Sequence, residues 1–93
     1  MVNSKVVLIV DEDKINRNVL AKILKDEYTI ILAQNGTEAL KILKTNYKRI
    51  AAIIIDLEMK TMDGYELLKE IHQASDYSKI PIIASNHLGS EEQ

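Results

Sequence analysis

Five acidic residues are the candidates for chemistry in this chain, because they follow directly on two apolar runs. They are Asp11, Glu12, Asp13, Asp56 and Glu58. The apolar runs, residues 6–10 and 50–55, are rich in β-branched residues and do not alternate with polar ones. This pattern is typical of strands that are buried on both faces of a parallel sheet. The carboxyl ends of such strands form the edge at which ligands bind, so these acids are candidate site residues.

If the two runs form neighbouring strands, three or more carboxylates meet in one crevice. Carboxylates that lie so near to one another repel each other unless a cation lies among them. All-oxygen ligands suit a hard divalent ion such as Mg²⁺, which keeps several water molecules. The physical interpretation is a Mg²⁺ site with one carboxylate left to react. The alternative is that acids gather in these loops only because loops are solvated, and the spacing alone supports both interpretations equally.

Length and composition indicate one small domain with few special features. The chain has 93 residues, of which 46% are hydrophobic, and its formal net charge is −2 with both signs interspersed. Such a surface offers no basic patch for a nucleic acid. Cysteine is absent, which excludes a disulfide framework and thiolate zinc ligands. The apolar run near the N-terminus is too short for a signal peptide or a membrane span, so we expect a cytoplasmic protein that does not associate with membranes.

The periodicity of apolar residues changes regularly along the chain and predicts the fold class. Strands are predicted at residues 5–10, 28–33, 50–55 and 80–84, and helices at residues 14–25, 37–46 and 64–74. Alternation of this kind with short connections predicts parallel strands, right-handed crossovers and helices on both faces of the sheet. We therefore expect an α/β protein with an open flavodoxin-like sheet in the strand order 2-1-3-4.

Individual residues refine these predicted elements. Thr37 is a plausible N-cap for the second helix, and Pro81 lies near the start of the last strand, where a missing N–H is tolerated. The first helix has apolar residues at the spacing of a single face. They are Ile15, Val19, Leu20, Ile23 and Leu24.

Other functional motifs are excluded because the residues they require are not present at the required spacing. A calcium loop starting at Asp11 would need Gly at its sixth position and Glu at its twelfth, where the chain has Asn16 and Lys22. Three isolated glycines make neither a dinucleotide fingerprint nor a P-loop. Ser85 and His87 lack the nucleophile elbow that would support a hydrolase triad.

Four blocks of the sequence together resemble the receiver domains of two-component response regulators. They are VLIVDEDKINR at residues 7–17, ILAQNGTEAL at 31–40, IIIDLEMKTMDGYELLKEI at 53–71 and IPIIA at 80–84. The similarity covers nearly the whole chain, so the expected domain is a single receiver domain over residues 1–93. The resemblance implies a phosphoacceptor module that takes a phosphoryl group from a histidine kinase or a phosphotransfer protein. It implies no enzyme beyond self-phosphorylation and self-dephosphorylation.

The resemblance also assigns roles to particular residues. Asp56 matches the phosphoaccepting aspartate, whose carboxylate forms an acyl phosphate. Asp11 and Glu12 match the acidic pair that holds Mg²⁺ together with Asp56. Glu58 matches the position whose backbone carbonyl completes the metal coordination. Asn86 falls at the position where the family has a switch Ser or Thr, and it lacks the hydroxyl.

Three departures from the family pattern leave an alternative function open. Lys60 stands where the family usually has Pro, Asn86 replaces the switch hydroxyl, and no counterpart exists for the fifth strand, its lysine and the final helix. We therefore expect a receiver that is C-terminally truncated relative to the family. The alternative is a non-phosphorylated pseudo-receiver or fragment that serves as a protein interaction or dimerisation domain. An exposed edge on the strand at residues 80–84 would then support a homodimer.

Overall fold

Strands and helices alternate along the chain in the predicted order. The computed structural model describes residues 5–60 and 64–85. The elements in these ranges are β1 (Lys5–Val10), α1 (Lys14–Leu24), β2 (Tyr28–Ala33), α2 (Gly36–Asn46), β3 (Ile50–Asp56), α3 (Gly64–Gln73) and β4 (Ile82–Ser85). None of the helices in these ranges has the length and apolar character needed to cross a bilayer.

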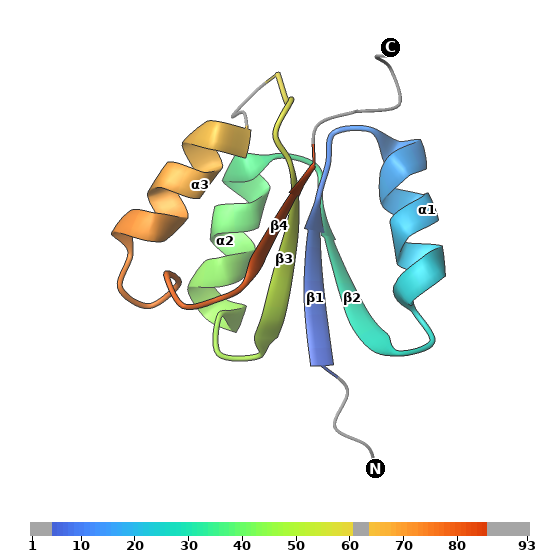
Figure 1. The fold of residues 1–93 in the computed structure, drawn as a ribbon, viewed down its shortest axis with the longest axis horizontal. Coiled ribbons are helices and arrows are strands. Elements are labelled where there is room, and N and C mark those ends of the chain that lie inside the picture. The colour runs from blue at the N-terminus through green and yellow to red at the C-terminus, as the bar shows by residue number, and fades with distance from the viewer. Residues whose placement is uncertain (1–4, 61–63, 86–93) are drawn as a thin grey trace.

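The four strands form one parallel sheet with the order β2-β1-β3-β4. Helix α1 covers one face of this sheet, and α2 and α3 cover the other face (Figure 1). All four strands run in the same direction, so their carboxyl ends lie together at the top of the view in Figure 1. The predicted α/β class, the open flavodoxin-like sheet and the strand order are therefore confirmed.

The main core lies between the sheet and the pair α2 and α3. Alternate residues of β1 and β3 supply one side of it, because successive side chains of a strand point to opposite faces. The fully or almost fully buried residues in this layer include Leu8, Val10, Ile53, Ile55, Ala39, Leu43, Leu67 and Ile71. Each large apolar side chain buried here stabilises the fold by about 1.5–3 kcal/mol. This layer therefore anchors β1 and β3, the strands that lead into the acidic loops.

Helix α1 packs differently, because none of its residues is buried. Leu20 and Leu24 are half-buried, whereas the exposed fractions are 73% for Ile15, 51% for Val19 and 67% for Ile23. The predicted single apolar face thus divides into a half-buried part and a part that faces water.

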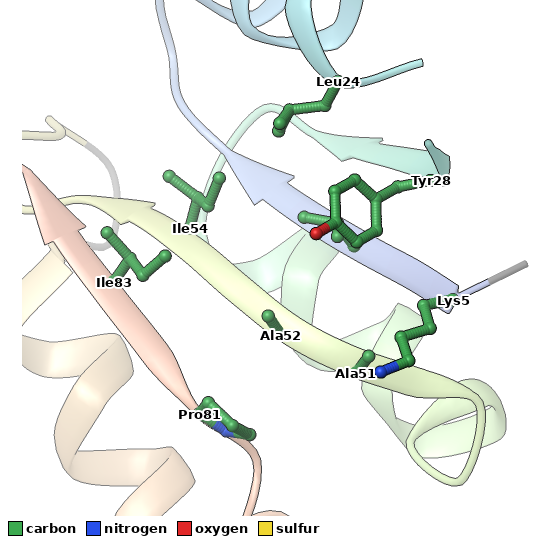
Figure 2. Close-up of a pocket in the computed structure, with 9 residues that line it drawn as sticks. Lys5, Leu24, Tyr28, Ala51, Ala52, Ile54, Pro81 and Ile83 are labelled. Atoms are coloured by element: carbon green, nitrogen blue, oxygen red, sulfur yellow. The ribbon is translucent and has the colours of Figure 1, made fainter. Parts of the chain in front are cut away.

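An apolar groove of about 340 Å³ lies on the same side of the sheet as α1. Leu24 of α1, Ala52 and Ile54 of β3 and Ile83 of β4 line it, and so do Tyr28 of β2 and Lys5 of β1 (Figure 2). Together with the exposed stripe of α1, the groove leaves a broad apolar surface on this face of the sheet.

Two predicted details of the element boundaries are wrong. The N-cap of α2 is Asn35, whose side chain accepts a hydrogen bond from the Glu38 N–H at 2.8 Å, so Thr37 lies inside the helix. The last strand begins at Ile82, after Pro81, because proline has no N–H to donate to the sheet. The Pro81 carbonyl still accepts a hydrogen bond from the Ile53 N–H at 2.9 Å.

Candidate functional site

The two acidic loops meet at the carboxyl edge of the sheet because β1 and β3 are neighbouring strands. Val10 pairs with Ile55, and the next residues are Asp11, directly after β1, and Asp56, the last residue of β3. The Asp11 side chain is only 5% exposed and that of Asp56 only 3% exposed, and they are the two buried charged side chains in residues 5–60 and 64–85. The structure thus places two of the candidate residues side by side at the predicted edge.

Both buried aspartates are oriented by the backbone that follows them. The Asp13 N–H donates to Oδ1 of Asp11 at 2.8 Å, and the Glu58 N–H donates to Oδ1 of Asp56 at 3.0 Å. Each bond spans two residues, which is the Asx-turn pattern common after strands. The same type of local hydrogen bond therefore holds one oxygen of each carboxylate and sets the direction in which the side chain points.

Asp13 has a structural role at the start of α1. It is the N-cap residue, and its Oδ1 accepts hydrogen bonds from the N–H groups of Ile15 at 2.9 Å and Asn16 at 3.5 Å. These bonds satisfy donors that the first turn of a helix leaves without a partner. Because its carboxylate is exposed and used in the cap, Asp13 is a poor candidate for a ligand in the crevice.

Arg17 is a residue of this region to which our sequence analysis gave no role. Its Nη1 donates to the backbone oxygen of Asp11 at 2.7 Å and to that of Glu12 at 3.2 Å. The guanidinium therefore restrains the main chain of the acidic pair from within α1. A signal was present in the sequence, namely a cation one helical turn after the N-cap of a helix that follows an acidic loop.

Glu12 connects the two loops across the edge of the sheet. Its Oε2 accepts a hydrogen bond of 2.8 Å from the main-chain N–H of Lys60, a residue 48 positions away. Glu12 is half-buried, whereas Glu58 and the Lys60 side chain are exposed. The assignment of the Glu58 backbone carbonyl to a metal stays a prediction. Asn86, the candidate switch position, lies outside the described residues.

The donor set at this edge fits a hard divalent cation. Within the described ranges no three acidic or histidine side chains gather into a ready-made metal site. Mg²⁺ does not need such a cage, since it is usually held by one or two carboxylates and keeps several waters. Two buried carboxylates at neighbouring strand ends are also costly without a compensating positive charge. Asp11 and Asp56 thus provide the ligand type and the charge that such an ion requires.

Comparison with known proteins identifies the family of this fold and site. Residues 7–92 match the family described as response regulator receiver domain. This match covers both acidic loops and all of the described helices. The chain therefore belongs to the response regulator receiver domain family, a class of two-component signalling domains.

Similar proteins come from plants and bacteria. The two-component response regulator ORR6 of rice (Oryza sativa subsp. japonica) is 37% identical over 83% of this chain. A high-resolution structure of the Vibrio cholerae chemotaxis protein CheY4 is 32% identical with a TM-score of 0.79, covering 87% of this chain and 67% of that one. The Mn²⁺-bound form of response regulator Rcp1 is 28% identical with a TM-score of 0.79, covering 94% and 68%. The chain spans 46% of the length of ORR6, and less than two thirds of the other curated relatives it matches.

Proposed function

We propose that this chain is a phosphoacceptor module in which Asp56 receives a phosphoryl group from a histidine kinase or a phosphotransfer protein. The observation that supports this function best is the position of Asp56. Asp56 is the last residue of β3 and only 3% exposed, and it directly follows Ile55, which pairs with Val10 just before Asp11. A buried carboxylate at the ligand-binding edge of an α/β sheet is placed for chemistry, and a purely structural turn residue would not require a second buried acid beside it.

The reaction is a single group transfer from a phosphohistidine. One carboxylate oxygen of Asp56 forms a bond to phosphorus while the bond between phosphorus and the imidazole nitrogen breaks. The bonding electron pair stays on the imidazole, which takes up a proton, and the product is an acyl phosphate. Hydrolysis of this acyl phosphate by water would regenerate Asp56. Apart from self-phosphorylation and self-dephosphorylation, the module would not turn over a substrate.

The same proposal includes a Mg²⁺ ion held by Asp11, Glu12, Asp56 and the backbone carbonyl of Glu58. When bound, such an ion neutralises the charge that develops on the phosphoryl oxygens during in-line transfer. The residues of the chain would position the carboxylates, through Arg17 and the two Asx turns. The Mn²⁺-bound form of the similar protein Rcp1 supports a divalent ion in this family.

Titration with Mg²⁺ is expected to shift the NMR signals of amides around Asp11 and Asp56. The expected Kd is on the order of 10⁻³ M, because only a few protein oxygens and several waters would hold the ion. The amides near His72, at the C-terminal end of α3, serve as an internal control. Their NMR signals should not shift. If the amide signals of both acidic loops do not shift at Mg²⁺ concentrations well above the expected Kd, the proposed metal site is wrong.

The phosphoacceptor function is tested with a small phosphodonor such as acetyl phosphate. Intact-mass analysis is expected to show one added phosphoryl group when the donor and Mg²⁺ are both present, and none when Mg²⁺ is replaced by a chelator. A chain that binds Mg²⁺ and still gains no mass would contradict the function. This outcome would leave the alternative of a pseudo-receiver.

A second function, dimerisation, is favoured by the apolar surface on the α1 side of the sheet. The exposed fractions of Ile15, Val19 and Ile23 of α1 are all above 50%, and Ile83 of β4 is 58% exposed. These four side chains together expose on the order of several hundred Å², a size at which an apolar patch is often functional. Strand β4 also lies at one edge of the sheet, where another strand can add.

We therefore expect two chains per particle at micromolar concentration, measured by sedimentation equilibrium. The substitution Ile83→Lys should return the chain to a monomer, because a charged residue on an edge strand opposes pairing. Thr29→Lys is the matched control, since Thr29 is an exposed residue of β2, the strand at the opposite edge. A wild-type chain that is monomeric, or an equal loss of dimer in both variants, would contradict dimerisation through this side.

A further inference from the structure

Two apolar surfaces on one side of the sheet are exposed in the described part of the chain. Among the elements in residues 5–60 and 64–85, α1 is the helix on this side, and it packs mainly on β1 and β2. The half of the sheet made by β3 and β4 is largely uncovered here, and Ile54 and Ile83 point from it into the apolar groove (Figure 2). The second surface is the exposed stripe of α1, formed by Ile15, Val19 and Ile23.

The exposed stripe is turned away from the sheet and toward its uncovered half. Leu20 and Leu24 are half-buried and mark the side of α1 that faces the sheet. At about 3.6 residues per turn, Ile15 lies nearly opposite to that side, and Ile23 lies about a quarter turn from it. Because α1 is right-handed and runs against the strands, this quarter turn points toward β3 (Figure 1). The exposed Asn18 lies on the other flank of the helix.

We infer that a second copy of this chain covers the β3–β4 half of the sheet, with its own α1 lying in the groove. This inference rests on the dimerisation proposed above and names the surface that the second copy uses. Two identical faces that stack are related by a two-fold axis between the sheets. An axis across the strands would put the second α1 in the space of the first. An axis parallel to the strands puts it beside the first, over the uncovered strands.

The resulting dimer covers both apolar surfaces of each copy at once. The two α1 helices form one layer between the two sheets, and each sheet is covered by one helix from each copy. Ile15 then faces the uncovered half of the other sheet, and the two Ile23 side chains meet at the axis. A specific interface covers roughly 800 Å² on each partner, and the stripe and the groove would supply its apolar centre. The flank that carries Asn18 stays in water.

The first test introduces one cysteine into a chain that has none. Ile23→Cys brings the two thiols of a dimer close together at the axis, whereas the matched control Asn18→Cys places them on opposite outer flanks. A short bismaleimide is expected to link most of the Ile23→Cys chains into covalent dimers at micromolar concentration. Intact-mass analysis should show Asn18→Cys as single chains. Equal linking of the two variants, or no linking of Ile23→Cys, would overturn the arrangement.

Sedimentation equilibrium on the same variants separates a wrong arrangement from a failure of dimerisation. Both cysteine variants should sediment as two chains before the reagent is added. Dimers that do not link through residue 23 would mean pairing by another surface, such as the β4 edge, so the inference would fail while dimerisation stands. A monomeric wild-type chain would refute dimerisation and the inference with it.

Val19→Lys is a further variant that does not depend on cross-linking. The Val19 side chain is 51% exposed, so the single chain should keep its fold, whereas the dimer would have to bury the new charge. We expect the dimer Kd to rise roughly 30-fold or more, as for a residue near the centre of an interface. Asn18→Lys should leave the Kd close to that of the wild type. A Val19→Lys chain that dimerises as tightly as the wild type would contradict the inferred role of α1.

Discussion

Asp56→Asn is expected to abolish the phosphoryl mass increment that we expect for the wild-type chain with acetyl phosphate and Mg²⁺. An amide oxygen is a far weaker nucleophile than a carboxylate oxygen and cannot form the acyl phosphate. The side chain is only 3% exposed, and the asparagine is nearly the same size, so the surrounding packing should be retained. Loss of modification with an unchanged unfolding transition would therefore report on the chemistry and not on the fold.

The matched control for this experiment is Glu58→Gln. It makes the same chemical change two residues away, on an exposed side chain whose backbone N–H bonds to Asp56 at 3.0 Å. Because the substitution leaves that N–H and the Glu58 carbonyl in place, modification should stay close to the wild-type extent. If Asp56→Asn still gains the phosphoryl mass, another residue is the acceptor and the assignment of Asp56 is wrong.

The sheet could be predicted from the sequence because burial on two faces limits the residue types of its central strands. Ile53 and Ile55 face the core beneath α2 and α3 and are fully buried, while Ile54 lines the groove on the other side. Both faces therefore need apolar residues, and the sequence shows this need as an unbroken run. Once β1 and β3 are neighbours, the placement of Asp11 beside Asp56 follows from the parallel register.

The packing of α1 could not be predicted in the same way. Helical periodicity shows which residues share a face, but it does not show how much of that face another element covers. Leu24 reaches the groove, whereas Ile15 and Ile23 remain largely in water. The division depends on where the helix lies above the sheet, which is a tertiary property.

The contacts that order the site were also beyond the sequence, because they use backbone atoms. The Lys60 N–H that bonds to Glu12 and the main-chain oxygens that accept from Arg17 are backbone groups; every residue type has such an oxygen, and every one except proline has such an N–H. The positions that supply these backbone groups therefore have no characteristic residue type that could be recognised in the sequence. Only the path of the chain shows that residues 48 positions apart meet.

Gly64→Ala is expected to destabilise the fold by about 3 kcal/mol, at the upper end of the usual cost of overpacking. Gly64 is the buried first residue of α3, and it packs directly against the backbone of Asp56, at the end of β3, and of Leu57. A Cβ at this position would lie 2.5 Å from the Asp56 carbonyl oxygen, 2.9 Å from the Leu57 nitrogen and closer still to the Leu57 Cα. All three are backbone atoms, so no side chain can rotate away to relieve the contact.

The start of α3 would have to move away from the end of β3 and the residue that follows it to accept the methyl group. That movement would stretch the hydrogen bond of 3.1 Å from the Gly64 N–H to the Leu57 carbonyl, which joins α3 to the end of β3. Denaturant unfolding measures the loss of stability, and in a domain of this size the melting temperature should fall by more than about 10 °C. Lys69→Ala, an exposed change on the same helix, should stay within about 0.5 kcal/mol of the wild type.

The consequence for the site follows from the same contact. Because Asp56 and Leu57 form the surface on which Gly64 packs, the shift should also disturb the Asp56 carboxylate and weaken the proposed Mg²⁺ binding in the fraction that remains folded. A Gly64→Ala variant that loses less than about 1 kcal/mol of stability would show that the loop adjusts easily. In that case the close packing of α3 on the loop would not be what holds Asp56 in place.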